Sequence, residues 1–163
     1  MVNVLDKVQP KNRIQLEQLI DYAFKHNIYD LNFIDTSKIT NMSNLFMNCE
    51  YDIDVSNWDV SNVTNMSAMF YYCKKFDCDL SNWDVSNVTN TAGMFYFCNK
   101  FDCDLSNWDV SNVKYMYFMF GHCKQFNCDL SRWNTSKAKT TLNMFDGCDK
   151  MTIPNWYKLY HRK

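Results

Sequence analysis

The feature that most constrains the fold is a repeat of 25 residues that runs through most of the chain. The segment Ser-Asn-Trp-Asp-Val-Ser-Asn-Val begins at Ser56, Ser81 and Ser106, and a diverged copy, Ser-Arg-Trp-Asn-Thr-Ser-Lys-Ala, begins at Ser131. One unit of this length cannot bury its own apolar face, so neighbouring copies must stack on one another. The repeat therefore predicts one continuous stack and no chain of independent domains.

Large or apolar side chains recur at fixed positions of each copy. Equivalent positions of stacked copies lie above one another, so each column of side chains shields its own members from water. The predicted core columns are Phe46, Phe70, Phe95, Phe120 and Phe145; Cys49, Cys73, Cys98, Cys123 and Cys148; and Trp58, Trp83, Trp108 and Trp133.

Each copy is expected to contain two local geometries. Phe76, Cys78 and Leu80 alternate with aspartates, which is the two-residue period of an extended strand. From Val85 onward the apolar steps lengthen to three or four residues, which favours a helical or 3₁₀ return. The predicted fold is a repeat solenoid with short parallel strands, helical or 3₁₀ returns and an N-terminal capping α-helix.

Both ends of the chain depart from the repeat, because a stack needs polar outer faces at its ends. Residues 12–27 carry apolar side chains at helical spacing, which predicts an amphipathic capping helix. Such a helix also suits docking on a partner or a membrane surface, although its mixed charge disfavours the membrane. The predicted single domain has an N-terminal cap over 1–28, five repeats over 29–153 and a C-terminal cap over 154–163.

The charge composition disfavours nucleic acid as a partner. Seventeen Lys and Arg residues against eighteen Asp and Glu residues leave a net charge of −1, which gives no field to attract phosphate backbones or anionic lipid. No stretch approaches the ~20 apolar residues of a transmembrane helix, and the first residues do not resemble a secretory signal. We therefore expect an intracellular protein without membrane insertion.

The spacing of the cysteines follows the repeat and does not match a zinc or redox signature. Besides the core column, Cys78, Cys103 and Cys128 form a second column. We expect all of them to be small, buried, reduced thiols. Oxidation or metal binding between stacked thiols is the alternative.

Aspartates recur in two rows, where stacked like charges repel one another. Turn amides, nearby lysines, a cation or a basic protein partner would each offset this repulsion, and turn capping is the simplest explanation. A calcium loop is disfavoured because its glycine and its bidentate glutamate are absent. The first row holds Asp52, Asp54, Asp77, Asp79, Asp102, Asp104 and Asp129, and the second holds Asp59, Asp84 and Asp109.

The segment Phe33-Ile-Asp-Thr-Ser-Lys-Ile-Thr-Asn-Met42, followed by repeats of Met-Phe-x-x-Cys-x-x-Phe-x-x-Asp-Leu-Ser-Asn-Trp-Asp-Val-Ser-Asn-Val, closely resembles the BspA-like family, also labelled DUF285. The resemblance covers nearly the whole chain and implies a variant leucine-rich-repeat fold. It implies no catalytic residue, and a role in binding or adhesion. The chain looks most like intracellular members from large DNA viruses, which implies the host cytoplasm or the virion. It departs from the family where Cys78, Cys103 and Cys128 replace an expected Gln.

No catalytic constellation is evident, since His26, His122 and His161 accompany no nucleophile motif, phosphate loop or metal-ligand pair. We expect no enzyme and no cofactor. The leading hypothesis is a monomeric protein–protein interaction scaffold. The alternatives are a self-associating structural component and a calcium-dependent adhesive surface. The predicted partner-binding residues are Asn57, Asp59, Asn82, Asp84, Asn107, Asp109 and Arg132.

Overall fold

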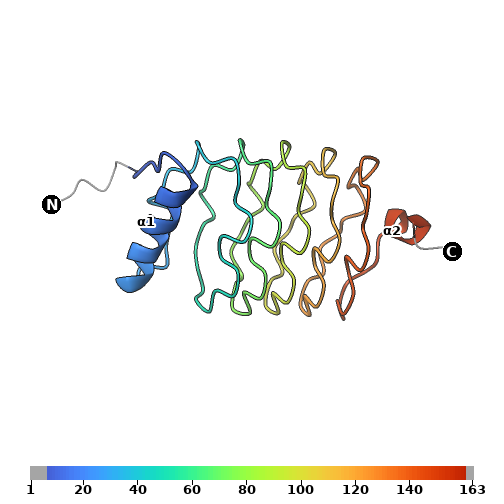
Figure 1. Ribbon diagram of the computed structural model, residues 1–163. Helices are drawn as coiled ribbons and strands as arrows, with labels where there is room; N and C mark the ends of the chain where they lie inside the picture. Colours follow the sequence, from blue (N-terminus) through green and yellow to red (C-terminus); the bar gives the residue numbers. More distant parts are fainter. Residues whose placement is uncertain (1–6, 161–163) are drawn as a thin grey trace.

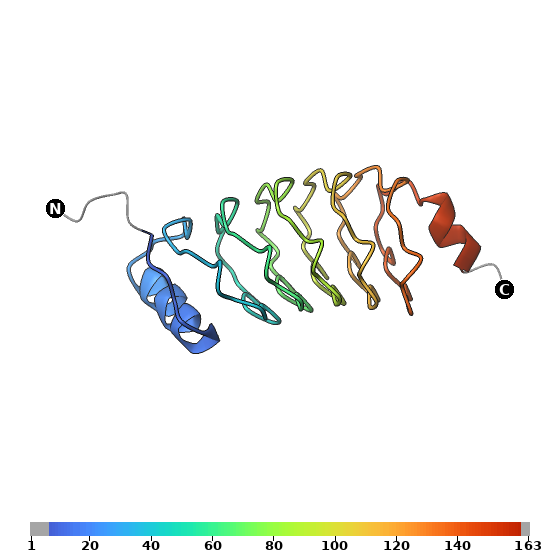
Figure 2. The ribbon, with the colours of Figure 1, turned by 90° about the horizontal axis from the view of Figure 1, so that it is seen from above.

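The protein is a row of stacked coils with a helix at each end, as the computed structural model, which describes residues 7–160, shows (Figure 1). The helix α1 spans Arg13–Lys25, and the helix α2 spans Asn155–Tyr160. Between the helices, successive coils lie side by side in both ribbon views (Figure 2). No helix in this part of the chain is long and apolar enough to cross a membrane.

Different segments cover the two ends of the stack. Asn12 caps α1, because its side-chain oxygen accepts a hydrogen bond from the N–H of Gln15 at 3.0 Å. Arg13 then joins the helix to the first coil by donating from Nη1 to the carbonyl oxygen of Asn41 at 3.1 Å. At the other end, the indole N–H of Trp156 donates to the carbonyl oxygen of Leu130 at 2.8 Å.

The predicted leucine-rich-repeat solenoid of short strands and helical returns is wrong. Residues 7–160 contain no β-strand, and their only helices are α1 and α2. Neighbouring coils pair instead through isolated parallel β-bridges, and the rest of each coil consists of turns and irregular chain. One column of bridges joins Asn41, Asn65, Asn90, Tyr115 and Thr140 in succession.

Side chains replace backbone pairing in the segment where strands were expected. The N–H of Leu80 donates to Sγ of Cys103 at 3.1 Å, and its carbonyl oxygen accepts from the indole N–H of Trp108 at 3.0 Å. Side chains of the next coil therefore satisfy both backbone groups of Leu80, which leaves neither group for a strand ladder. The same arrangement recurs at Val55 and Leu105.

The backbone bonds between coils lie where a helical return was expected. The N–H groups of Gly93 and Phe95 donate to carbonyl oxygens of the next coil, each at 2.9 Å. Between them, the N–H of Met94 bonds back to Thr91 within its own turn. This alternation requires left-handed backbone at Gly93 and Phe97, with φ of 62° and 61°. A chain that reverses at these two positions is neither a strand nor a helix.

Columns of rings fill the interior of the stack. The five Phe residues of the predicted column are buried, and neighbouring rings stack nearly parallel with centroids 5.6–5.8 Å apart. Offset stacking of this kind adds about 0.5–1.5 kcal/mol per pair beyond the burial of apolar area. The four Trp residues of the predicted column are also buried. In the first Cys column, Cys73, Cys98 and Cys123 are buried, while the terminal members Cys49 and Cys148 are half-buried.

Candidate functional site

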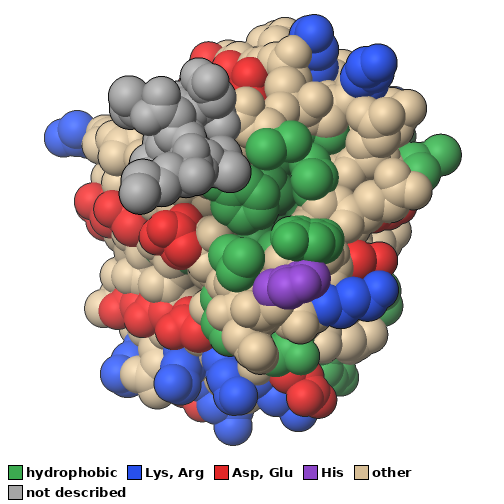
Figure 3. All heavy atoms as spheres, turned by 90° about the vertical axis from the view of Figure 1, so that its left-hand side faces the viewer, with side chains coloured by type: hydrophobic (Ala, Val, Ile, Leu, Met, Phe, Trp, Pro, Cys, Tyr) green, Lys and Arg blue, Asp and Glu red, His purple; other side chains and the backbone are tan. Residues whose placement is uncertain are grey.

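The first row of aspartates lies exposed along one side of the stack and is called the acidic face here. Its members alternate with inward residues such as Ile53, Cys78 and Leu130. Figure 3, which views the stack from the α1 end, shows acidic side chains lying one behind another along one side. The acidic face consists of Asp52, Asp54, Asp77, Asp79, Asp102, Asp104 and Asp129.

Backbone N–H groups hold these carboxylates in place. Asp79 and Asp104 each accept a hydrogen bond at 2.9 Å, from the N–H of Ser81 and of Ser106 respectively. These bonds favour the charged form, so they lower the pKa of both carboxyl groups. The carboxylates therefore remain negative into the acid range, and their repulsion is partly offset by turn capping.

The second cysteine column lies between the acidic face and the core. Sγ of Cys103 is 3.5 Å from Oδ1 of Asp79, and Sγ of Cys128 is 3.3 Å from Oδ1 of Asp104. Burial raises the pKa of Cys103 to about 11 and that of Cys128 to about 12, so both thiols are protonated at neutral pH and donate to the carboxylates. These cysteines therefore help to fix the position of the charges.

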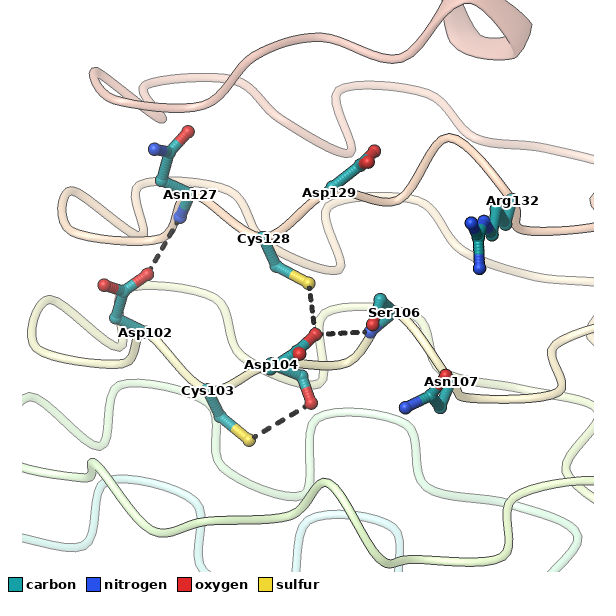
Figure 4. A pocket seen from close by; sticks show the side chains of 9 residues that line it. All are labelled: Asp102, Cys103, Asp104, Ser106, Asn107, Asn127, Cys128, Asp129 and Arg132. Carbon is teal, nitrogen blue, oxygen red and sulfur yellow. Dashed lines mark hydrogen bonds between the residues drawn. The ribbon is translucent and has the colours of Figure 1, made fainter.

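Hollows open along the acidic face between successive coils. The hollow in Figure 4 has a volume of about 450 Å³, and Asp102 and Asp104 lie on one coil while Asp129 lies on the next. Oδ1 of Asp102 accepts a hydrogen bond from the N–H of Asn127 at 3.0 Å, which joins the two coils. Neighbouring hollows of about 500 and 340 Å³ lie along the same face. Similar acidic hollows therefore recur along this face.

The negative charge of this face is largely uncompensated. Within residues 7–160, no carboxylate of the acidic face forms an ion pair. The lysines near its corners do not neutralise it in this way. Arg132 lines the hollow and helps to lower the pKa of Asp129, although the N–H of Ser131 is the larger cause. In the same part of the chain, no group of three or more His, Cys, Asp or Glu residues is arranged to hold a metal ion.

The structure distributes the seven predicted partner-binding residues over two places, and all seven are exposed. Asn107 and Arg132 line the hollow of the acidic face, while Asn57 and Asn82 hold the position of Asn107 in earlier coils. The other three form the second row, in which each carboxylate accepts an N–H bond from a following serine at 3.0 Å. These three residues are Asp59, Asp84 and Asp109.

A further surface escaped the sequence analysis. Partly exposed aromatic side chains follow the buried Phe column directly in the chain, as at Tyr71, Tyr72, Tyr96 and Phe97. Their rings stack from coil to coil, with centroids 5.0 Å apart for Tyr71–Tyr96 and 4.5 Å apart for Tyr72–Phe97. The sequence offers no regular signal for this surface, because the residues at these positions differ from copy to copy.

Comparison with known proteins places the chain in a family. A search of curated proteins and a search of solved structures each found no match. The family described as "Mycoplasma protein of unknown function, DUF285" matches residues 14–108 and residues 79–158. Together these matches run from the capping helix through all of the coils to the C-terminal helix. The chain therefore belongs to the DUF285 family.

Proposed function

We propose that this protein is a non-catalytic interaction scaffold whose acidic face binds a positively charged segment of a partner protein. The observation that carries the proposal is the exposed row of carboxylates without ion pairs, which runs over several coils. The family match adds no function, since the family itself is described as having none known.

The acidic face suits a basic segment because its charges are fixed before binding. Turn bonds such as Ser81 N–H to Asp79, and thiols such as Cys103, already hold the carboxylates. Little side-chain entropy then remains to be lost on binding. Coils stack at roughly the 4.8 Å spacing of paired chains, so an extended segment along the stack meets carboxylates at each coil. Charge of one sign on one face also steers an oppositely charged partner towards it.

The test removes charge from the acidic face without removing its turns. Asp79, Asp104 and Asp129 are replaced together by Asn, whose side-chain oxygen accepts the same N–H bond, as Asn134 already does from Ser136 at 3.1 Å. Tagged protein is expressed in the native cell, and the partners retained by each variant are quantified by mass spectrometry. The triple variant is expected to retain about tenfold less partner than wild type.

The matched control is the triple replacement Asp59→Asn, Asp84→Asn and Asp109→Asn. It removes the same number of charges from turns of the same kind, but in the second row. Retention close to wild type is expected. If the control loses the partner and the first variant retains it, the partner binds the second row and not the acidic face.

An intracellular, reducing location is also part of this proposal. Sγ of Cys73 donates to the carbonyl oxygen of Phe46, and Sγ of Cys98 donates to that of Phe70, each at 2.9 Å. Oxidation would remove these donors from the core, so the stack favours reduced thiols. The viral-type membership and the calcium-dependent adhesive alternative stay predictions.

A further inference from the structure

The partly exposed aromatic residues form a second surface, which we call the neutral aromatic face. It comprises Tyr71, Tyr72, Tyr96, Phe97, Tyr117, Phe118 and Leu142, none of which carries a formal charge at neutral pH. His122, whose ring stacks on Phe97 with centroids 4.3 Å apart, and Lys74, whose Nζ lies 5.9 Å from the ring of Tyr72, border this face. Tyr117 and Leu142 are the most exposed of these side chains, at 42% and 53%. The face is separate from the acidic face, because the two share no residue.

Backbone strain indicates that these rings do more than hold the stack together. Tyr72, Phe97 and Phe118 adopt left-handed backbone with φ of 61°, 61° and 55°, a conformation that bulky side chains disfavour. Other coils use Asn48, His122 or Gly147 at the position of Tyr72 and Phe97, and Asn44 or Gly93 at that of Phe118; Asn and Gly tolerate this conformation. The stack itself therefore has no need of an aromatic ring there.

The neutral aromatic face contains both a hollow and a projection. The hollow has a volume of about 370 Å³, and its lining includes the small residues Ala68, Ala92 and Gly93 and the rings of Tyr96 and Tyr117. In the two following coils, the position of Ala92 is taken by Tyr117 and then by Leu142. Small residues therefore give way to large, exposed ones along the same column.

We propose that the neutral aromatic face binds the same face of a second copy of this chain about a two-fold axis. Such a contact places Leu142 of each copy against the hollow of the other copy, where it meets the lining residue Tyr117. A two-fold contact requires a patch that is complementary to itself, and a hollow beside a projection on one face meets that requirement.

Charge supports a second copy as the occupant. The nine residues that line the hollow carry no formal charge, so two copies meet there without repulsion. Two acidic faces would repel each other. The ends of the stack are covered by α1 and by the segment around Trp156, which leaves this lateral face for self-association. Four coils at about 4.8 Å give a face only about 19 Å long, so the dimer is expected to be weak and dependent on concentration.

Sedimentation velocity over a range of protein concentrations tests this proposal. The wild-type chain is expected to pass from monomer to dimer as concentration rises. Leu142→Asp and Tyr117→Ser are each expected to raise the dimer dissociation constant about tenfold or more, because aromatic and aliphatic anchors dominate small interfaces. Both side chains are exposed, so the melting temperatures of the variants should stay close to that of wild type.

The matched control is Ile14→Asp, which places the same charge at an apolar residue that is 65% exposed on α1. This variant should dimerise like wild type. The triple Asn variant of the acidic face should also dimerise normally, which separates this proposal from the proposed function. A wild-type chain that stays monomeric throughout, or a Leu142→Asp variant that dimerises as strongly as Ile14→Asp, would overturn the proposal.

Discussion

Each tryptophan of the chain binds a backbone carbonyl of the preceding coil. The five indole N–H groups donate at 2.8–3.2 Å, and the last donor, Trp156, extends the column beyond the final repeat. Indole has a single donor and no acceptor, so one bond satisfies the side chain completely. Each acceptor carbonyl also receives a turn N–H from its own coil, so the indole supplies its second hydrogen bond, which joins neighbouring coils. The acceptors are the carbonyl oxygens of Leu31, Val55, Leu80, Leu105 and Leu130.

Replacing Trp108 by Phe tests the contribution of one such bond. The substitution keeps a large aromatic side chain in the column but removes one of the two donors to the carbonyl oxygen of Leu80, which still accepts the N–H of Trp83 at 3.1 Å. We expect the free energy of unfolding to fall by about 0.5–1.5 kcal/mol, the net contribution of one hydrogen bond, as urea denaturation followed by circular dichroism would measure. Tyr115→Phe at an exposed position should change it by less than about 0.5 kcal/mol. Equal stability of the two variants would show that the indole bond contributes nothing.

The sequence repeat identifies which residues form columns, but not what their polar atoms bind. Trp108 recurs at a fixed position, and that is enough to predict that it is buried in the coil next to that of Trp83. Its acceptor depends on how far one coil is displaced relative to the next, which a repeat length does not specify. The same holds for Cys103, whose Sγ reaches both Leu80 and Asp79 of the preceding coil.

A single coil is closed by turns in which a side chain binds the backbone. In one coil, Asp79, Asp84 and Asn90 each accept an N–H bond from the residue two positions later, at 2.9–3.0 Å. Asp and Asn form such turns readily, which explains how a chain with three Gly and two Pro residues turns so often. These side-chain-capped turns are therefore the structural unit that recurs from coil to coil.

These turns predict how stability depends on pH. The N–H of the following serine lowers the pKa of Asp79, Asp104 and Asp129 below the ordinary value of 3.8. A group whose pKa is lower in the folded state stabilises the fold fully above the unfolded value and loses that contribution as pH falls through the folded value. The melting temperature should therefore be constant from neutral pH to about pH 5 and should fall below about pH 4.

The triple Asn variant of these residues is the control for that dependence. Asn keeps the acceptor of the turn but does not titrate, so its melting temperature should fall less steeply in acid. Parallel curves for wild type and variant would show that these carboxylates do not govern acid stability.

At the scale of elements, the sequence predicted burial better than hydrogen bonding. The alternation of Phe76, Cys78 and Leu80 does mark inward positions, but alternation follows from extended chain and does not require a paired strand. The helix over 12–27 was predicted because the helical spacing of its apolar residues lies within one segment. The coil-to-coil bonds involve residues about 25 positions apart, and a local pattern carries no information about them.

The whole molecule presents two faces of different chemistry on one regular stack. A net charge of −1 conceals this division, because acidic residues gather on one side while the neutral aromatic face carries no charge. The acidic rows were predicted from the repeat, since every copy contributes the same residues. The aromatic face was not predicted, because its residues differ from copy to copy and become a surface only when the orientation of the coils is known.

The central claim is that the acidic face binds positive charge by contact, and one titration tests it most directly. A fluorescently labelled oligolysine peptide is titrated with wild-type protein and with the two triple Asn variants at several salt concentrations, and anisotropy gives the dissociation constant. The account predicts that affinity falls with rising salt, and that loss of Asp79, Asp104 and Asp129 weakens binding about tenfold more than loss of Asp59, Asp84 and Asp109. Equal affinity for all three proteins, or binding that is insensitive to salt, would contradict it.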